Sequence, residues 1–422
     1  MRALLVLLVA APLAAQMPPV RLINAPDASS PHVFGTVAGV RQLAGGGLLV
    51  NDIQKRQLTL LGPSLGSPTV VADSVSGGAN SYGARPGGLI PYFGDSSLFV
   101  DPVGLSMFVI DPTGKIARVA SVPRSQDAMF IGTNLLGNPA IDSHGRLVYR
   151  GSFARMMPAP PVAGKLPTFP QPPDSAPLVR IELATRKLDT AAFFKIPKIK
   201  MNVQQTDNRI SVTSEQNPMP IVDDWAVLAD GSIAVVRGQD FHVDIVHADG
   251  TTSSAGKVPF DWQRLSDSDK VAVIDSAKAA FESARSRVAS GDGGGAGRGG
   301  GRGGDGMVVM SFRNGEGGGI RTGDAGGLPP VTFISPSELP DYRPAFGVNA
   351  ALADLDGNLW VRTTATREGA AGPIYDVISG KGELIDRVQL PPGRQIVGFG
   401  KGGIVYMVAV DASGAWLERS HR

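Results

Sequence analysis

Residues 346–390 read FGVNAALADLDGNLWVRTTATREGAAGPIYDVISGKGELIDRVQL, and this stretch contains the unit that the rest of the chain repeats. Short apolar runs alternate with turns at Asp354-Leu355-Asp356-Gly357 and Gly380-Lys381-Gly382, where the chain must reverse. Both turns predict hairpins, because Asp and Asn tolerate left-handed backbone and Gly adopts it without steric cost. Four strands fit this stretch. One such sheet cannot bury both of its faces, so it requires further copies of itself.

Similar units recur along the chain. Four earlier sets of four strands span 36–72, 88–120, 139–194 and 221–258, and three more strands fall within 396–419. In four units the glycines of the first and second hairpin turns are 20, 20, 19 and 25 residues apart; these pairs are Gly46 and Gly66, Gly94 and Gly114, Gly231 and Gly250, and Gly357 and Gly382. A near-constant step of this kind in a chain of short strands predicts a β-propeller.

The last set has only three strands, so its fourth strand must come from elsewhere in the chain. The segment Val20-Arg21-Leu22-Ile23 has no partner nearby, and we expect it to complete this set. Such a strand would join the two chain ends and remove an exposed sheet edge. The predicted fold class is therefore all-β, with one six-bladed β-propeller domain over residues 16–422.

Three sequence motifs carry a resemblance to a known group of proteins. ADLDGNLWVR, YDVISGKGELIDRVQLP and LADGSIAVVRG resemble the six-bladed β-propellers of the NHL and TolB-like group, especially exported bacterial members whose function is unassigned. The likeness covers most of the mature chain, but its motifs are structural: a turn Asp-Gly, an apolar strand and a terminal aromatic residue. It therefore implies the fold and says little about function.

The N-terminus and the composition predict where the protein works. Residues 1–15, MRALLVLLVAAPLAA, combine one basic residue, an apolar core and a small-residue end, which is typical of a signal peptide cleaved near Ala15. No later run approaches the roughly 20 apolar residues of a transmembrane helix. The absence of cysteine excludes disulfides and thiolate metal sites, and the net charge of +2 gives no reason to expect nucleic acid. We expect a soluble periplasmic or secreted bacterial protein.

Three segments interrupt the repeat. Residues 154–176 are rich in proline, residues 195–220 are polar, and residues 259–340 contain the one convincing helix, at about 266–289. Ser266 and Asp269 predict its N-terminal cap. Its predicted apolar face consists of Val271, Ile274, Ala277, Phe281, Ala284 and Val288. Residues 291–306, GDGGGAGRGGGRGGDG, cannot form a core and are expected to be a disordered linker.

All three insertions fall on one side of the predicted ring, because each replaces either a loop between strands two and three or a connection between blades. We call this side the insertion-bearing face. Long loops on a rigid scaffold are where binding sites are usually built. The ligand site is therefore expected on this face.

Arginines recur where second strands end on that face. VYRG, VVRG and WVRT place Arg150, Arg237 and Arg362 five, six and five residues after their turn glycines. Asn51 and Asp101 lie near the same level in blades one and two. Three guanidinium groups on one rim would bind a carboxylate or phosphate, so these five residues are the predicted ligand-binding set. The alternative is that each arginine pairs with an acidic residue of the adjacent blade.

Two functions remain open from the sequence. The first is a module that binds a small anionic ligand or an exported protein partner through the insertion-bearing face, without a cofactor. The alternative follows from the resemblance, which implies a metal-dependent lactonase-like or lyase-like enzyme with Glu, Asn and Asp ligands on inner strands. For that role the chain offers Asn349 and Asp223 or Asp224.

Two further features of the sequence leave a role open. Asp240, His242 and Asp244 share a strand face, and they form either a metal or acid–base group or a solvated surface. The predicted helix could also dock another protein on a purely structural scaffold. No catalytic residue and no metal ligand is assigned from the sequence.

Overall fold

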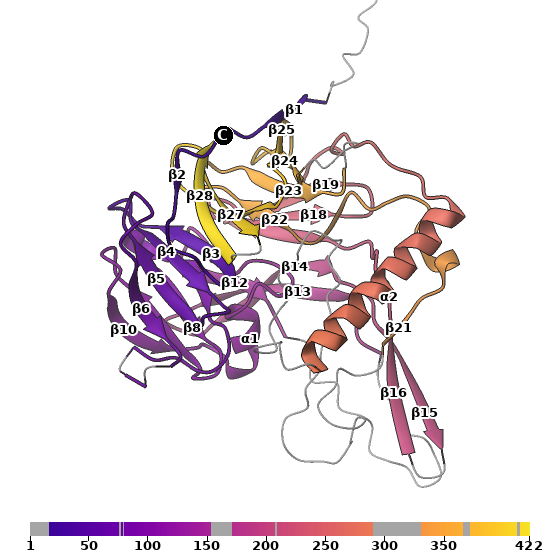
Figure 1. Cartoon of the computed structure of the whole chain (residues 1–422), viewed down its shortest axis with the longest axis horizontal. Helices are drawn as coiled ribbons and strands as arrows, with labels where there is room; N and C mark the ends of the chain where they lie inside the picture. Colours follow the sequence, from indigo (N-terminus) through magenta and orange to yellow (C-terminus); the bar gives the residue numbers. More distant parts are fainter. Residues whose placement is uncertain are drawn as a thin grey trace, which may run out of the picture.

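The computed structural model is built almost wholly of short β-strands, and six sheets stand side by side as the blades of a propeller (Figure 1). It describes residues 17–75, 77–78, 80–152, 171–206, 209–289, 331–365, 372–411 and 414–422. The predicted signal peptide, the glycine-rich linker at 291–306 and most of the proline-rich segment lie outside these residues. The predicted six-bladed propeller is confirmed.

In each blade the strands that are consecutive in the chain pair antiparallel. Blades one to three contain β3 (Val37–Gln42), β4 (Leu48–Asp52), β5 (Gln57–Leu61), β6 (Thr69–Asp73); β7 (Gly88–Pro91), β8 (Ser97–Asp101), β9 (Ser106–Ile110), β10 (Ile116–Ser121); and β11 (Ala140–Ile141), β12 (Arg146–Arg150), β13 (Ser175–Glu182), β14 (Leu188–Lys195). Blades four to six contain β17 (Asp224–Val227), β18 (Ile233–Arg237), β19 (His242–Val246), β20 (Thr252–Ser254); β22 (Phe346–Ala353), β23 (Leu359–Thr363), β24 (Ile374–Ile378), β25 (Leu384–Gln389); and β26 (Arg394–Phe399), β27 (Ile404–Asp411), β28 (Gly414–His421).

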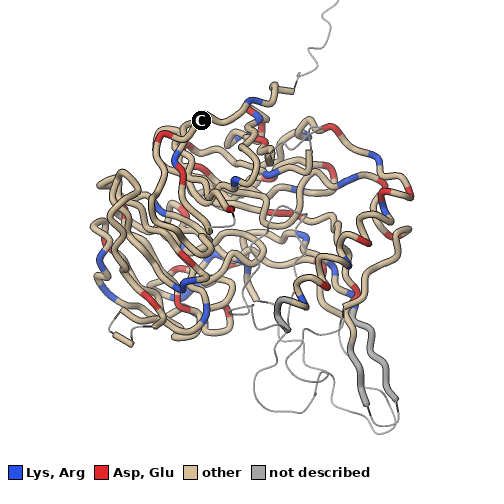
Figure 2. Tube along the Cα trace, viewed as in Figure 1, with Lys and Arg blue, Asp and Glu red and all other residues tan. Residues whose placement is uncertain are grey.

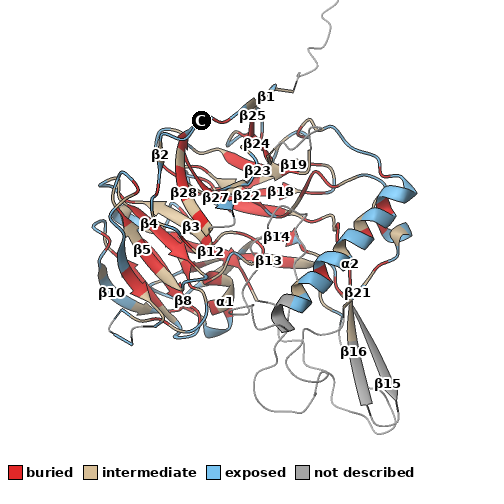
Figure 3. Cartoon of the chain, in the orientation of Figure 1, coloured by how far each residue is buried: buried red, intermediate tan, exposed pale blue. Residues whose placement is uncertain are grey.

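The core lies between the blades, as the buried colouring of the sheets in Figure 3 shows. Successive residues of a strand point to opposite faces, so each blade packs against both of its neighbours. In β23, Trp360 packs toward blade six, whereas Leu359 and Val361 pack toward blade four. An apolar cluster fills each interface between neighbouring blades, including the one between blades six and one. The ring is therefore closed by packing.

The first strand of each blade lines the centre of the ring. β3 contacts β26 on one side and β7 on the other, and contacts continue from β7 to β11, from β11 to β17 and from β17 to β22. These strands form the inner layer of the ring. Their first residues lie on the insertion-bearing face, because the connections between blades lead into them.

The N-terminal segment closes the ring, but with a different strand from the one expected. β2 (Ala28–Ser29) pairs with β28 in blade six, and Phe34 adds a bridge to Ala415. β1 (Val20–Leu22) instead runs parallel to β25 and adds a fifth strand to blade five. The prediction that the Val20 segment completes the last blade is wrong. A side-chain ion pair fixes β1 where it lies, since Arg21 Nη2 is 2.6 Å from Asp386 Oδ2.

Two of the three insertions fold together. β15 (Lys200–Thr206) and β16 (Arg209–Gln216) form a hairpin that extends away from the blades in Figure 1, and β21 (Val331–Phe333) pairs with β16 in parallel. Helix α2 (Asp267–Ala289) joins them through a small core of Met219, Leu265, Ile274, Ile334 and Leu339. We call these elements, with the short turn η3 (Pro336–Glu338), the insertion unit. The sequence had indicated no strands in residues 195–220.

Helix α2 begins as predicted but buries a narrower face. The Ser266 hydroxyl accepts from the Asp269 N–H at 3.2 Å, and Asp269 Oδ2 accepts from the Ser266 N–H at 2.8 Å, which confirms the cap. Ile274 and Phe281 are buried, whereas Val271 is 47% exposed. Most of the helix surface is exposed in Figure 3.

The described chain carries both signs of charge, interspersed along its trace (Figure 2). Among its helices, none is long and apolar enough to cross a membrane.

Candidate functional site on the insertion-bearing face

The predicted site residues do not all occupy equivalent places. The backbone hydrogen bond that closes each first hairpin provides a common reference, and its accepting carbonyls belong to Gly47, Ser96, Arg146, Ser232, Asn358 and Ile404. Four residues later the six blades carry Asn51, Val100, Arg150, Val236, Arg362 and Val408. Arg237 and Asp101 come one residue after that level. Since alternate residues face opposite sides of a strand, Arg237 faces the preceding blade and Arg150 and Arg362 face the following one.

The shared level that the sequence predicted for the three arginines is therefore wrong for Arg237. The described residues also give no contact that joins any two of the three arginines. Each has to be considered in its own surroundings.

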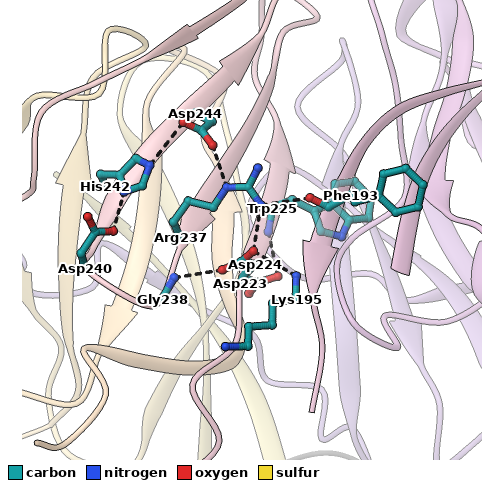
Figure 4. A network of polar contacts seen from close by, with 10 residues as sticks. All are labelled: Phe193, Lys195, Asp223, Asp224, Trp225, Arg237, Gly238, Asp240, His242 and Asp244. Atoms are coloured by element: carbon teal, nitrogen blue, oxygen red, sulfur yellow. Dashed lines mark hydrogen bonds and ion pairs between the residues drawn. The ribbon is translucent and has the colours of Figure 1, made fainter. Parts of the chain in front are cut away.

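Arg237 lies at the centre of a network of polar contacts (Figure 4). Its Nε donates to Asp244 Oδ2 at 2.7 Å, and its Nη1 donates to Asp223 Oδ2 at 2.8 Å and to the Phe193 carbonyl at 2.9 Å. Burial alone would lower the pKa of Arg237, but the bonds to the two carboxylates raise it above its usual value. Arg237 thus follows the ion-pair alternative, although both carboxylates belong to its own blade.

The same network contains the Asp240, His242 and Asp244 group. His242 Nδ1 lies 2.6 Å from Asp240 Oδ1, and its Nε2 lies 3.3 Å from Asp244 Oδ1. The hydrogen bond with His242 lowers the pKa of Asp240, and Lys257 Nζ lies 3.5 Å from the other Asp240 oxygen. His242 lies between the carboxylates of Asp240 and Asp244, and Lys257 and Arg237 pair with these two carboxylates. Each ring nitrogen of His242 has a carboxylate oxygen beside it, and the arrangement stabilises the end of blade four.

Arg150 is buried beneath the connection between blades two and three. Its side chain is only 3% exposed, and its guanidinium carbon lies 4.1 Å from the ring centroid of Phe130, within the short helix α1 (Ala128–Ile131). A guanidinium over an aromatic face is a favourable cation–π contact. Burial lowers the pKa of Arg150 to about 10. This arginine supports α1 and is covered by it.

Arg362 has different surroundings from the other two arginines. It pairs in register with Tyr375 and lies opposite a wide bulge in β22, where the register shifts between Phe346 and Ala351. It is partly buried, and within the described ranges its side chain makes no hydrogen bond and no ion pair. Its positive charge acts on Asp224 electrostatically: burial raises the pKa of Asp224, and Arg362 opposes part of that rise.

Asn51 and Asp101 hold backbone groups in place. Asn51 Nδ2 donates to the Gly87 carbonyl at 2.8 Å, which links blade one to blade two. Asp101 accepts from the N–H groups of Gly83 and Val103, at 3.0 Å each. Both side chains are 3% exposed. In these contacts they order the loops at the ends of their strands.

A segment that the sequence did not single out crosses between the inner strands on this face. Residues 132–138 follow α1 and make hydrogen bonds to the inner strands of blades one, four and five. The bonds are Asn134 Nδ2 to Ala38 O at 3.5 Å, Trp225 Nε1 to Leu136 O at 3.0 Å, Gly137 N to Asn349 Oδ1 at 3.0 Å and Asn138 Nδ2 to Ala351 O at 3.2 Å. The signal that could have revealed it is the run of asparagine and glycine in TNLLGNP.

Asp224 joins blades four and five beside this segment. Its Oδ2 accepts from the N–H groups of Ala350 and Ala351 at 2.6 and 2.9 Å, and its Oδ1 accepts from Trp225 N at 2.9 Å. Burial raises the pKa of Asp224 to about 6, and the backbone hydrogen bonds and Arg362 oppose that rise. The carboxylate therefore ties the first strand of blade four to the bulge of β22.

The residues considered for a metal do not fit that role. Both oxygens of Asp224 accept backbone hydrogen bonds, Asn349 Oδ1 accepts from Gly137, and Asp223 is bound to Arg237. Across the described part of the chain, no three His, Asp or Glu side chains form a group that could hold a metal ion.

Comparison with known proteins gives structures of similar architecture at low scores. No family model matches the sequence, and no curated protein matches it. A putative gluconolactonase shares 12% identity over 94% of this chain and 93% of its own, with a TM-score of 0.39. The calcium-binding protein regucalcin from Agrobacterium tumefaciens shares 11% identity over 96% of this chain and 98% of its own, with a TM-score of 0.40. A catalytically inactive virginiamycin B lyase from Staphylococcus aureus with quinupristin shares 9% identity over 93% of this chain and 98% of its own, with a TM-score of 0.38. At these identities and TM-scores, the activities of the similar proteins say nothing about the chemistry of this chain.

Proposed function

We propose that this protein is an exported binding module that takes a small ligand with a carboxylate or phosphate group on its insertion-bearing face, and that Arg362 is the residue that meets this group. One observation supports the proposal. Arg362 is partly buried, yet in the part of the chain that the structure describes no carboxylate is paired with it. A guanidinium fork is well suited to a carboxylate or phosphate, because it can donate two parallel hydrogen bonds.

The other two arginines have structural roles in this proposal. Arg237 already donates to Asp223, Asp244 and the Phe193 carbonyl, so an incoming anion would compete with two carboxylates for its charge. Arg150 lies under Phe130 and is nearly inaccessible. Of the predicted set, Arg362 is therefore the residue that can offer its charge to a ligand at the lowest cost.

The experiment compares Arg362→Gln with wild type, using inorganic phosphate and citrate as probes. Isothermal titration calorimetry measures affinity, and differential scanning fluorimetry measures the melting temperature. A hydrogen-bonded charge contributes about 1.5–3 kcal/mol, so the variant should bind about 10- to 150-fold more weakly. Arg118→Gln is the control, because Arg118 is exposed on the outer strand β10 and should change nothing.

Two results would count against the proposal. Equal affinity of Arg362→Gln and wild type would remove Arg362 from the site, and no binding of either probe at millimolar concentration would argue against a simple anion site. Metal analysis of the purified protein addresses the lactonase-like or lyase-like alternative. A divalent ion that stays in stoichiometric amount through dialysis would favour that alternative.

A further inference from the structure

A two-stranded ribbon joins the insertion unit to the propeller. Residues 260–265 lead from blade four to α2, and residues 339–344 return from η3 to blade five. The two segments run antiparallel, with hydrogen bonds from Arg343 N to Gln263 O at 2.9 Å and from Leu265 N to Asp341 O at 2.8 Å. An isolated bridge pairs Arg264 with Tyr342 between them. We call this pair of segments the ribbon.

The pattern of these bonds fixes how the side chains lie. Because residues 263 and 265 on one segment bond to residues 343 and 341 on the other, Arg264 and Tyr342 form a non-hydrogen-bonded pair, whose side chains lie close together on one face. Trp262 is two residues before Arg264 and so shares that face. Its contact with Phe260, at 5.4 Å between ring centroids, agrees with this alternation.

This face of the ribbon exposes aromatic surface. Trp262 is 39% exposed and Tyr342 is 49% exposed, whereas Trp225 and Trp360 are fully buried in the blades. Phe260 connects the ribbon face to the core, since its ring lies 5.7 Å from that of buried Phe241. Trp, Tyr and Arg are the residue types that dominate binding energy in protein interfaces.

One edge of the ribbon is open. Residues 263 and 265 use their backbone groups toward the partner segment, so the N–H and C=O groups of Trp262 and Arg264 point away from it. Neither of these two residues makes a backbone hydrogen bond to any other described residue. An unpaired strand edge is a template onto which another extended chain can add.

The edge also carries an available positive charge. The Arg264 side chain is exposed and, within the described chain, has no hydrogen bond and no ion pair. Its carboxylate neighbour Asp341 is bound by Lys270 Nζ at 2.7 Å, and the pKa of Asp341 is lowered first by Lys270 and then by Arg264. The charge on Arg264 is therefore left for a partner.

We propose that an extended acidic peptide segment of a partner protein adds as a strand along Trp262–Arg264. Its backbone would pair with the outward N–H and C=O groups of Trp262 and Arg264. One of its carboxylates would meet Arg264, and an apolar side chain would lie on Trp262 and Tyr342. The open backbone edge favours a peptide over a polysaccharide, because only a peptide offers donors and acceptors at the two-residue spacing of a strand. This proposal does not rest on the Arg362 site.

The test uses a short acetylated and amidated peptide of alternating valine and glutamate. Calorimetry gives its affinity, and acrylamide quenching of tryptophan fluorescence reports whether the exposed Trp262 becomes protected. Arg264→Ala should weaken binding about tenfold through loss of the charge. Arg264→Pro should weaken binding further, because proline also removes the outward N–H and leaves the ladder bonds of Gln263 and Leu265 intact. Arg118→Ala is the control.

Three comparison probes make the outcome decisive. Methylating alternate peptide nitrogens, or replacing glutamate with lysine, should abolish binding. Polygalacturonate, which carries carboxylates without a peptide backbone, should leave Trp262 open to acrylamide. The proposal is overturned if the methylated peptide binds as tightly as the parent, if Arg264→Pro equals Arg264→Ala, if polygalacturonate protects Trp262 in place of the peptide, or if neither protects it.

Discussion

Asp376 provides the sharpest test of the electrostatics inside the ring. It lies in β24, is completely buried, and accepts from Arg387 Nε at 3.1 Å through Oδ1, while its Oδ2 has no hydrogen bond within the described residues. Burial raises the pKa of Asp376 to about 6; Arg387 opposes the rise, and Asp261 adds to it. The folded protein therefore binds a proton on Asp376 at a pH where the unfolded chain has already released it.

The sign and size of the effect follow from this difference. A carboxyl whose pKa is raised on folding contributes stability that is fully present below its unfolded value of 3.8 and is lost as the pH rises through about 6. The difference between the folded and unfolded pKa values, at about 1.36 kcal/mol per pH unit, corresponds to about 3 kcal/mol of unfolding free energy. In Asp376→Asn the group cannot titrate. The free energy of unfolding of wild type minus that of the variant should therefore fall by about 3 kcal/mol between pH 3 and pH 7.

Urea denaturation at several pH values measures this difference. The other titrating groups are common to both proteins, so their contributions cancel when the unfolding free energy of the variant is subtracted from that of wild type. The change of this difference with pH does not depend on which protein is more stable at any one pH. Asp111→Asn is the control, because the hydrogen bond from the Thr113 hydroxyl lowers the pKa of the exposed Asp111 carboxylate, so its effect has the opposite sign and lies at lower pH. A wild-type minus Asp376→Asn difference that stays flat, or that rises with pH, would refute the reasoning.

Two further predictions concern stability. Arg237→Gln should lower the free energy of unfolding by about 1–3 kcal/mol, because it leaves the partly buried carboxylates of Asp223 and Asp244 without their cation; chemical denaturation measures this, and no loss would show that the network is only a surface ion pair. A chain that begins at Ile23 lacks only β1 and should still unfold cooperatively, whereas a chain that begins at Thr36 also lacks β2 and buried Phe34 and should lose at least about 3–5 kcal/mol. Equal stability of the two truncated chains would contradict closure by β2.

The blades could be predicted from the sequence because their signals are local. Asp-Gly turns, alternating apolar residues and short strands all occur within about 40 residues, and the structure places a blade at each predicted set. The cap of α2 is equally local, because Ser266 and Asp269 are neighbours on one helical turn. Ring closure was expected for a general reason, since an open edge is unfavourable. The closing strand itself could not be identified, because Ala28–Ser29 is only two residues long and has no apolar pattern.

The insertion unit shows a second limit of sequence reasoning. β16 and β21 are more than a hundred residues apart in the chain, yet they pair directly. Residues 195–220 contain no apolar periodicity that would predict the hairpin. Their structure depends on the other insertion, since Met219 is buried only by joining Leu265 and Ile274. A segment whose core is supplied by a distant segment gives no sign of that core in its own sequence.

The level of the arginines was, in contrast, readable from the sequence. Counts of five, six and five residues from the turn glycines already differ by one, and one residue is enough to turn a side chain to the opposite face of a strand. The count separates Arg237 from Arg150 and Arg362 without any structure. It cannot say which partners each arginine finds, because those partners lie outside the strand that carries the arginine.

The level shared by Asn51, Arg150 and Arg362 shows why those partners decide the role. Blades two, four and six carry buried valines at this level, so a polar residue there needs a partner beyond its own strand. Asn51 finds the Gly87 carbonyl, and Arg150 finds the ring of Phe130. Arg362 finds neither a carbonyl nor a carboxylate within the described residues. A partly buried guanidinium without a counter-charge costs folding free energy at a position where valine would pack well. An anion that binds from solvent at the insertion-bearing face would supply the counter-charge and offset that cost.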